Sequence, residues 1–150
     1  MTHPSTNNPS DSFRTECPTG SFDLVVPIAA LSDDDEHVFS YWIHDHPLLL
    51  QISSHRRFHG AQVNAANRLR AFLERQPLVS VSPIPDVSVE SCDFAACKGL
   101  SDDREVWVYA YAVWPDLAVM ITVSGDAQLV NDHENWAFTA IRSLRRIYPS

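Results

Sequence analysis

The sequence contains little lysine and little glycine, and each shortage excludes a class of function. Lys98 is the single lysine, and the 11 basic side chains face 19 acidic ones, for a formal net charge of −8. A chain with this balance repels phosphate backbones, so we predict no nucleic-acid partner. Only four glycines are present, and none lies in a P-loop or a dinucleotide-binding motif. A loop that cradles phosphate is therefore not expected.

Cysteines and long apolar runs are also scarce. Cys17, Cys92 and Cys97 are odd in number and have no C-x-x-C spacing, which is typical of reduced, cytosolic thiols. No basic segment followed by an apolar one marks a secretory leader, and every apolar run is shorter than the about 20 residues of a membrane span. We expect a cytoplasmic protein that does not associate with membranes.

The composition predicts one folded domain behind a polar tail. The chain has 150 residues, 45% of them hydrophobic, which suits a single core. Residues 1–20 are rich in Ser, Thr, Asn and Pro and have few large apolar groups, so we expect them to be disordered. Residues 21–150 then form the domain.

Two hairpins are predicted from apolar and aromatic runs divided by turn residues. Residues 38–43 and 48–52 are separated by Asp45-His46-Pro47, and residues 106–114 and 117–123 by Pro115-Asp116. β-Branched and aromatic runs around such turns are typical of paired strands. A further strand is expected before each hairpin, over residues 22–26 and 87–96, while the acidic residues 32–36 are expected to form an exposed loop.

A helix is expected after each hairpin. Apolar residues recur at helical spacing between Gly60 and Pro77, and again over residues 131–147. The predicted order is therefore β-ββ-α-β-ββ-α. We predict an α+β fold in which an antiparallel sheet of about six strands packs against two helices.

The strongest predicted strand has two different faces. Small residues alternate with an aromatic row formed by Trp107, Tyr109 and Tyr111. Aromatic rings with polar tips are frequent in binding surfaces, so this row is our candidate ligand- or partner-binding site. The alternative is that the row packs beneath a helix, as most large aromatic side chains serve packing first.

Histidines offer a second candidate chemistry. His44 and His46 have an H-x-H spacing, and His55 and His59 follow the same hairpin. A zinc site needs three or four ligands that meet in space, whereas His44 and His46 fall at the turn and His55 lies near the opposite end. We therefore predict no metal and no cofactor, and we keep a metal- or small-ligand-dependent enzyme that uses these histidines as an alternative.

Two segments resemble the PsbP-like fold, which is shared by PsbP and DcrB-type proteins. They are Phe22-Asp23-Leu24-Val25-Val26-Pro27 at the start and Trp136…Ala140-Ile141-Arg142-Ser143-Leu144-Arg145 at the end. The resemblance covers about residues 20–148 and carries no catalytic residues. It implies an α/β/α sandwich and mostly non-enzymatic, partner-binding roles.

These observations favour binding over catalysis. No nucleophile motif is present, and no catalytic residue is predicted. The first hypothesis is a protein-binding module with an adaptor, chaperone or immunity-type role. The metal- or small-ligand-dependent enzyme is one alternative, and a homodimer that self-associates through the aromatic face is the other.

Overall fold

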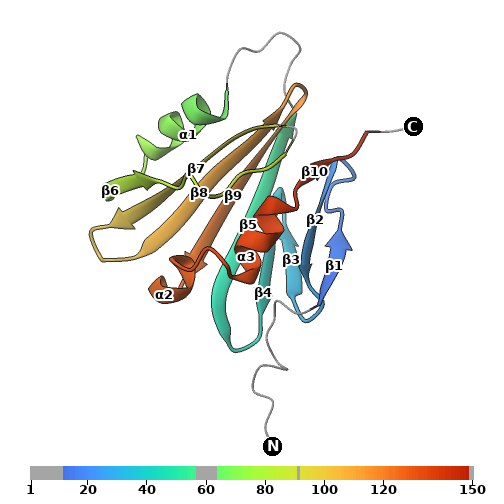
Figure 1. Cartoon of the computed structure of the whole chain (residues 1–150), viewed down its shortest axis with the longest axis horizontal. Coiled ribbons are helices and arrows are strands. Elements are labelled where there is room, and N and C mark those ends of the chain that lie inside the picture. Colours follow the sequence, from blue (N-terminus) through green and yellow to red (C-terminus); the bar gives the residue numbers. More distant parts are fainter. Residues whose placement is uncertain (1–11, 57–63, 91, 149–150) are drawn as a thin grey trace, which may run out of the picture.

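The main feature of the fold is a strongly curved antiparallel sheet of seven strands (Figure 1). The computed structural model describes residues 12–56, 64–90 and 92–148. From one edge to the other, the strands are β3 (Leu31–Asp35), β4 (Val38–Ile43), β5 (His46–Arg56), β9 (Leu117–Gly125), β8 (Val106–Trp114), β7 (Asp93–Ser101) and β6 (Leu78–Pro83).

Both predicted hairpins are present, and they meet at the centre of the sheet. The hairpin β4–β5 joins the hairpin β8–β9 through the antiparallel pair β5–β9, in which Leu50 lies opposite Val123 and Ile52 opposite Ile121. The sheet therefore consists of two halves, each built on one hairpin, as the sequence pattern predicts. Strand β3 extends the first half, and β7 and β6 extend the second.

A second, small sheet packs beside the large one. Its strands are β1 (Phe13–Glu16), β2 (Phe22–Pro27) and β10 (Arg145–Arg146), in the order β1-β2-β10. The strand at Phe13–Glu16 corrects the prediction of a disordered tail for residues 13–16, whereas residues 1–11 lie outside the described residues. Phe13 packs against the main core, which gives this short segment an apolar anchor despite its polar neighbours.

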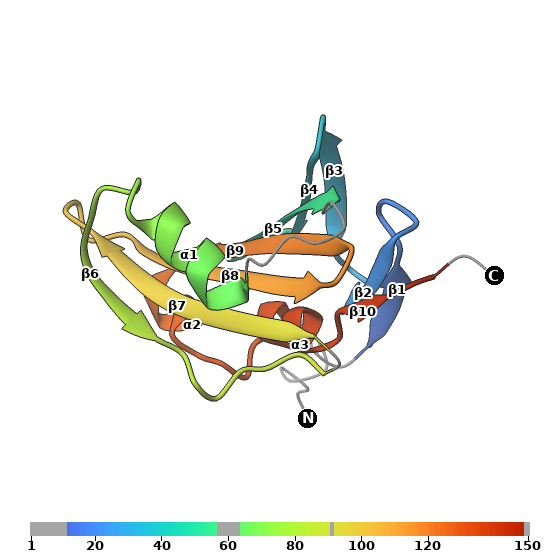
Figure 2. The same cartoon turned by 90° about the horizontal axis from the view of Figure 1, so that it is seen from above.

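Helices cover both faces of the large sheet (Figure 2), as an α/β/α arrangement requires. On one face lie α2 (Ala127–Val130) and α3 (Trp136–Arg142), together with β2. These elements enclose the main core, in which Trp136, Phe138 and Phe22 are fully buried. On the opposite face lies α1 (Ala65–Leu73), which contacts β7 and β8 over a smaller cluster of buried side chains.

The closing helix is much shorter than the predicted 131–147. The run Asn131–Asn135 interrupts it, and the Asn135 side chain accepts hydrogen bonds from the backbone N–H groups of Ala137 and Phe138. Asparagine in this role starts a new helix rather than continuing an old one. The predicted segment thus contains a connecting loop, α3 and the short strand β10, and the separate helix α2 ends just before it.

Two further predictions in the sheet are corrected. Residues 31–35 form the edge strand β3 instead of an acidic loop; a charged edge strand exposed along its whole length needs no apolar alternation. The strand predicted over residues 87–96 begins at Asp93. Val87 and Val89 lie in an irregular segment and are buried in the main core. Their apolar side chains therefore serve core packing and do not indicate a strand. Strand β6 was not predicted at all.

Within the described residues, no helix is both long enough and apolar enough to cross a membrane.

Candidate functional site

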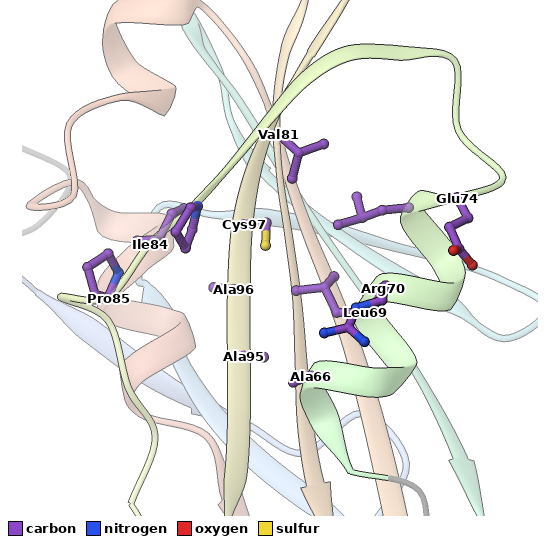
Figure 3. Close-up of a pocket in the computed structure, with 12 residues that line it drawn as sticks. Ala66, Leu69, Arg70, Glu74, Val81, Ile84, Pro85, Ala95, Ala96 and Cys97 are labelled. Carbon is purple, nitrogen blue, oxygen red and sulfur yellow. The ribbon is translucent and has the colours of Figure 1, made fainter.

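An apolar groove of about 620 Å³ lies between α1 and β6, and we call it the α1–β6 groove (Figure 3). Helix α1 forms one wall, β6 with the turn after it forms the other, and β7 forms the floor. The lining residues are Ala66, Leu69, Arg70, Leu73, Glu74, Val81, Pro83, Ile84, Pro85, Ala95, Ala96 and Cys97.

The groove exists because the floor residues are small. Ala95 and Cys97 come from β7, at positions opposite Tyr111 and Tyr109 of β8. Side chains of this size leave space above β7, whereas the large rings of β8 support α1 directly beside it. The rings of β8 therefore hold α1 above the sheet, and the small side chains of β7 leave the neighbouring space unfilled.

Local hydrogen bonds fix the position of α1 along the groove. Asn64 caps the helix by accepting a hydrogen bond from Asn67 N–H, as capping asparagines do. Asp93, at the start of β7, accepts a second one from Ala65 N–H at 2.8 Å. The helix N-terminus is thereby tied to the strand that forms the groove floor.

At the far end of the groove, Gly99 allows close packing of β6 on β7. A Cβ atom at this position would lie 2.8 Å from Leu78 Cδ1 and 3.1 Å from Tyr109 Cε2. The absence of a side chain lets Leu78 reach the cluster beneath α1. This glycine therefore helps to set the distance between the groove wall and its floor.

The chemistry of the groove is that of a binding surface. Its charged lining residues are Arg70 of α1 and Glu74, which caps the C-terminus of α1; both are exposed, and the remaining lining is apolar apart from the thiol of Cys97. Burial raises the pKa of the Cys97 thiol above its ordinary value, so the group stays protonated near neutral pH. A protonated thiol is a weak nucleophile and behaves as a small apolar side chain.

The predicted aromatic row lies next to the groove, underneath α1. Tyr109 and Tyr111 are 6% and 7% exposed, and Trp107 is half-buried. The ring centroids of Tyr109 and Phe72 of α1 lie 5.4 Å apart, and Trp107 stacks on Tyr109 with centroids 6.1 Å apart. The aromatic row is thus covered by a helix, which was the alternative interpretation of the sequence pattern. It supports one wall of the groove.

Among the described residues, the candidate histidines do not come together. His46 and His55 lie on the same strand, β5, separated by nine residue steps or about 30 Å. The fully buried Trp136 donates its indole N–H to His46 Nδ1 at 3.4 Å, while the His44 side chain is 85% exposed. His59 lies outside the described residues. Within the described chain, no group of three His, Cys, Asp or Glu side chains is placed to hold a metal ion.

A polar cleft of about 650 Å³ near the C-terminal strand is a weaker candidate. Arg142, Arg145 and Arg146 line it together with Tyr148. Each arginine already has a partner: Arg145 binds Asp23 at 2.7 Å, Arg146 binds Asp116 at 2.5 Å, and Arg142 donates to the His133 carbonyl. These pairs join β10 to β2 and α3 to the preceding loop, so the arginines hold the fold together.

The sequence prediction missed the groove because it missed β6. The run Leu78-Val79-Ser80-Val81-Ser82 is a β-branched alternation that indicates a strand, and the flanking Pro77 and Pro83 are typical of an edge strand. The small residues Ala95, Ala96 and Cys97 were the other available signal. Neither signal shows which side chains share a space, because the floor strand β7 is distant in the chain from α1 although β6 follows α1 directly.

Comparison with known proteins supports the fold and no more. No family model and no curated protein matches the chain. Among solved structures, the chain is similar to a crystal structure from Bacteroides thetaiotaomicron VPI-5482, with 14% identity and a TM-score of 0.53. The match covers 88% of this chain and 47% of the other, so the chain spans about half the length of that protein. The shared architecture is an α+β fold with an antiparallel sheet and packed helices.

Proposed function

We propose that the protein is a non-enzymatic, cytoplasmic binding module that holds an apolar segment of a partner protein in the α1–β6 groove. The observation that carries this proposal is the groove itself, with an apolar floor and walls and with its two charged side chains exposed on α1 and its C-terminal cap. Its volume of about 620 Å³ is typical of ligand-binding sites, which range over about 300–1,000 Å³. Apolar burial is the main driving force for occupying such a site.

The surroundings of the groove favour a protein occupant over a small molecule. Val81 of the groove wall is 47% exposed, and Val79 on the same strand is 62% exposed. Apolar surface therefore continues from the groove onto the edge strand β6, which carries no charged residue. Small-molecule sites enclose about 70–90% of their ligand, whereas a surface that continues beyond its groove suits a larger partner.

The same lining residues argue against catalysis in the groove. An activated nucleophile needs a base within hydrogen-bond reach, and the described residues that line the groove include no histidine, serine, threonine or tyrosine. Its ionisable groups are Arg70, Glu74 and the Cys97 thiol, and the pKa of that thiol is raised by burial. The proposal also agrees with the PsbP-like and DcrB-like resemblance of the opening strand and closing helix, which implies partner-binding roles.

Filling the groove tests the proposal. Ala66 is an exposed alanine of α1 that lines the groove, and Ala127 is an exposed alanine at the start of α2 on the other face of the sheet. Ala66→Trp adds a large side chain to the groove, and Ala127→Trp makes the same change elsewhere. Affinity capture with the wild-type protein provides candidate partners, and each candidate is then purified and its dissociation constant measured against the three proteins.

We expect Ala66→Trp to weaken binding of the partner by at least about tenfold, or about 1.4 kcal/mol. Ala127→Trp should bind like the wild type. Equal affinities for the two variants would place the partner outside the groove. Mass spectrometry that finds a small apolar molecule bound to the wild type, and lost from Ala66→Trp, would contradict a protein occupant.

A further inference from the structure

A second, smaller cavity lies on the opposite side of α1 from the groove. It encloses about 230 Å³ and is lined by Asn67, Arg68, Ala71, Phe72, Arg75 and Tyr111. At about 100° per residue, these helix positions centre roughly 160° away from those that line the groove. The cavity is therefore a separate site, and it stands independently of the proposed function.

Among the described residues, two arginines in this cavity have no carboxylate partner. Carboxylates there pair with Arg14, Arg145 and Arg146, and no ion pair or side-chain hydrogen bond of the described chain involves Arg68 or Arg75. Within the same residues, Arg68 Nε is shielded from solvent and has no hydrogen-bond partner. A partly buried charge without a partner is unfavourable, and native proteins rarely leave such a group unsatisfied. Because Nε itself has almost no accessible surface, a ligand in the cavity would meet Arg68 at the outer guanidinium nitrogens.

The remaining lining residues define what such a ligand would be. Among the described residues that line the cavity, none is acidic; Tyr111 and Asn67 add polar side chains, while Phe72 and Tyr111 provide aromatic walls. Tyr111 lies close enough to Arg68 for the guanidinium charge to act on its pKa, although burial is the larger effect and raises that pKa. The fork of an arginine side chain matches a planar carboxylate.

We infer that this cavity binds the carboxylate group of a small aromatic acid, with Arg68 as the principal contact and Arg75 as a second positive charge. The volume of about 230 Å³ is below that of sites for drug-sized ligands, so the occupant is a single carboxylate attached to one small aromatic group. A free acid and the C-terminal residue of a peptide chain share this chemistry.

Titration with benzoate tests the inference. The backbone amide signals of α1 and β8 are followed by nuclear magnetic resonance at pH 7, with sodium chloride adjusted to keep the ionic strength constant. We expect saturable shifts at the cavity residues in the wild type. Charge-assisted hydrogen bonds contribute more than neutral ones, so Arg68→Gln should weaken benzoate binding by about tenfold or more. Tyr111→Phe, which keeps the ring, should weaken it by about fivefold.

Arg70→Gln is the matched control because Arg70 lies on the same helix but lines the groove. This variant should bind benzoate like the wild type. Arg75→Gln provides a second cavity variant at an exposed position, should Arg68→Gln alter folding. If Arg70→Gln weakened benzoate binding as much as the cavity variants do, the effect would come from the overall positive charge of α1. That result would overturn the inference.

A second pair of probes separates the two sources of the carboxylate. N-acetylphenylalanine has the free carboxylate of a peptide end, and N-acetylphenylalanine amide lacks it. Binding of benzoate and N-acetylphenylalanine, but not of the amide, supports a carboxylate site that also accepts a peptide C-terminus. Binding of benzoate alone supports a carboxylate site that accepts only free acids. Shifts that chloride reproduces at equal ionic strength, or no saturable shifts for either acid, contradict the inference.

Discussion

The two faces of the large sheet are covered to very different extents. On one face, α2, α3 and β2 enclose a core whose largest side chains, including Trp136, Phe138 and Phe22, are fully buried. On the other face, a helix of nine residues covers β7 and β8 and leaves a cavity on each of its sides. The comparison indicates that the first face supplies most of the stability and that the second offers the surfaces for binding.

The largest effect is expected from Trp136→Ala, on the closed face. The substitution removes a fully buried ring together with the N–H that binds His46. Large-to-small changes of an aromatic side chain in a core cost about 3–5 kcal/mol. Urea unfolding followed by circular dichroism measures this loss. A cost below about 1 kcal/mol would show that this face is not the main source of stability.

A smaller effect is expected from Leu69→Ala, on the open face. Leu69 is 2% exposed and belongs to the smaller cluster beneath α1, but it also borders the groove, where neighbouring atoms are missing. We expect a cost of about 2 kcal/mol, the low end for a leucine. The two faces would be energetically equivalent if Leu69→Ala destabilised the protein as much as Trp136→Ala in the same unfolding experiment.

Alkaline pH provides the third and smallest effect, again through the closed face. Burial raises the pKa of Cys92 to about 11, whereas an unfolded thiol has a pKa of about 8.5. Between these values the unfolded chain loses a proton that the folded chain retains, so the stability is complete below pH of about 8.5 and falls as the pH rises toward 11.

The size of this alkaline loss is limited because Cys92 is only partly buried. After allowance for screening by solvent, we expect about 1 kcal/mol. Stability curves from pH 7 to pH 10.5 should be steeper for the wild type than for Cys92→Ala. Identical slopes for the two proteins would assign the alkaline loss to other groups, such as Tyr41, whose pKa burial raises to about 12.

Local patterns in the sequence predicted the centre of the fold. The Pro115-Asp116 turn lies between strands that do pair, and Pro77 does follow α1. The turn predicted at Asp45-His46-Pro47 lies instead at His44-Asp45, because His46 and Pro47 already belong to β5. These signals are local, since a turn and the strands beside it are neighbours in the chain. The alternation of β8 also placed Trp107, Tyr109 and Tyr111 on one face, although it left open whether a helix covers them.

The edges of the fold and the candidate site were less predictable. Strand β3 is acidic and exposed along its length, so it lacks the apolar alternation by which a half-buried strand is recognised. The α1–β6 groove depends on side chains from α1, β6 and β7, and its floor is set by the register between β7 and β8. Contacts of this kind are non-local, and propensity and periodicity do not determine them.

The central claim, that binding takes place on the α1 face, is tested most directly by photo-crosslinking in cells that naturally contain the protein. A benzoylphenylalanine side chain replaces Val79, which is exposed on β6 beside the groove but does not line it, or, as the matched control, Ala127 on the opposite face. We predict a discrete protein adduct from position 79 that is absent from position 127. No adduct at position 79, or the same adduct at both positions, would contradict the account.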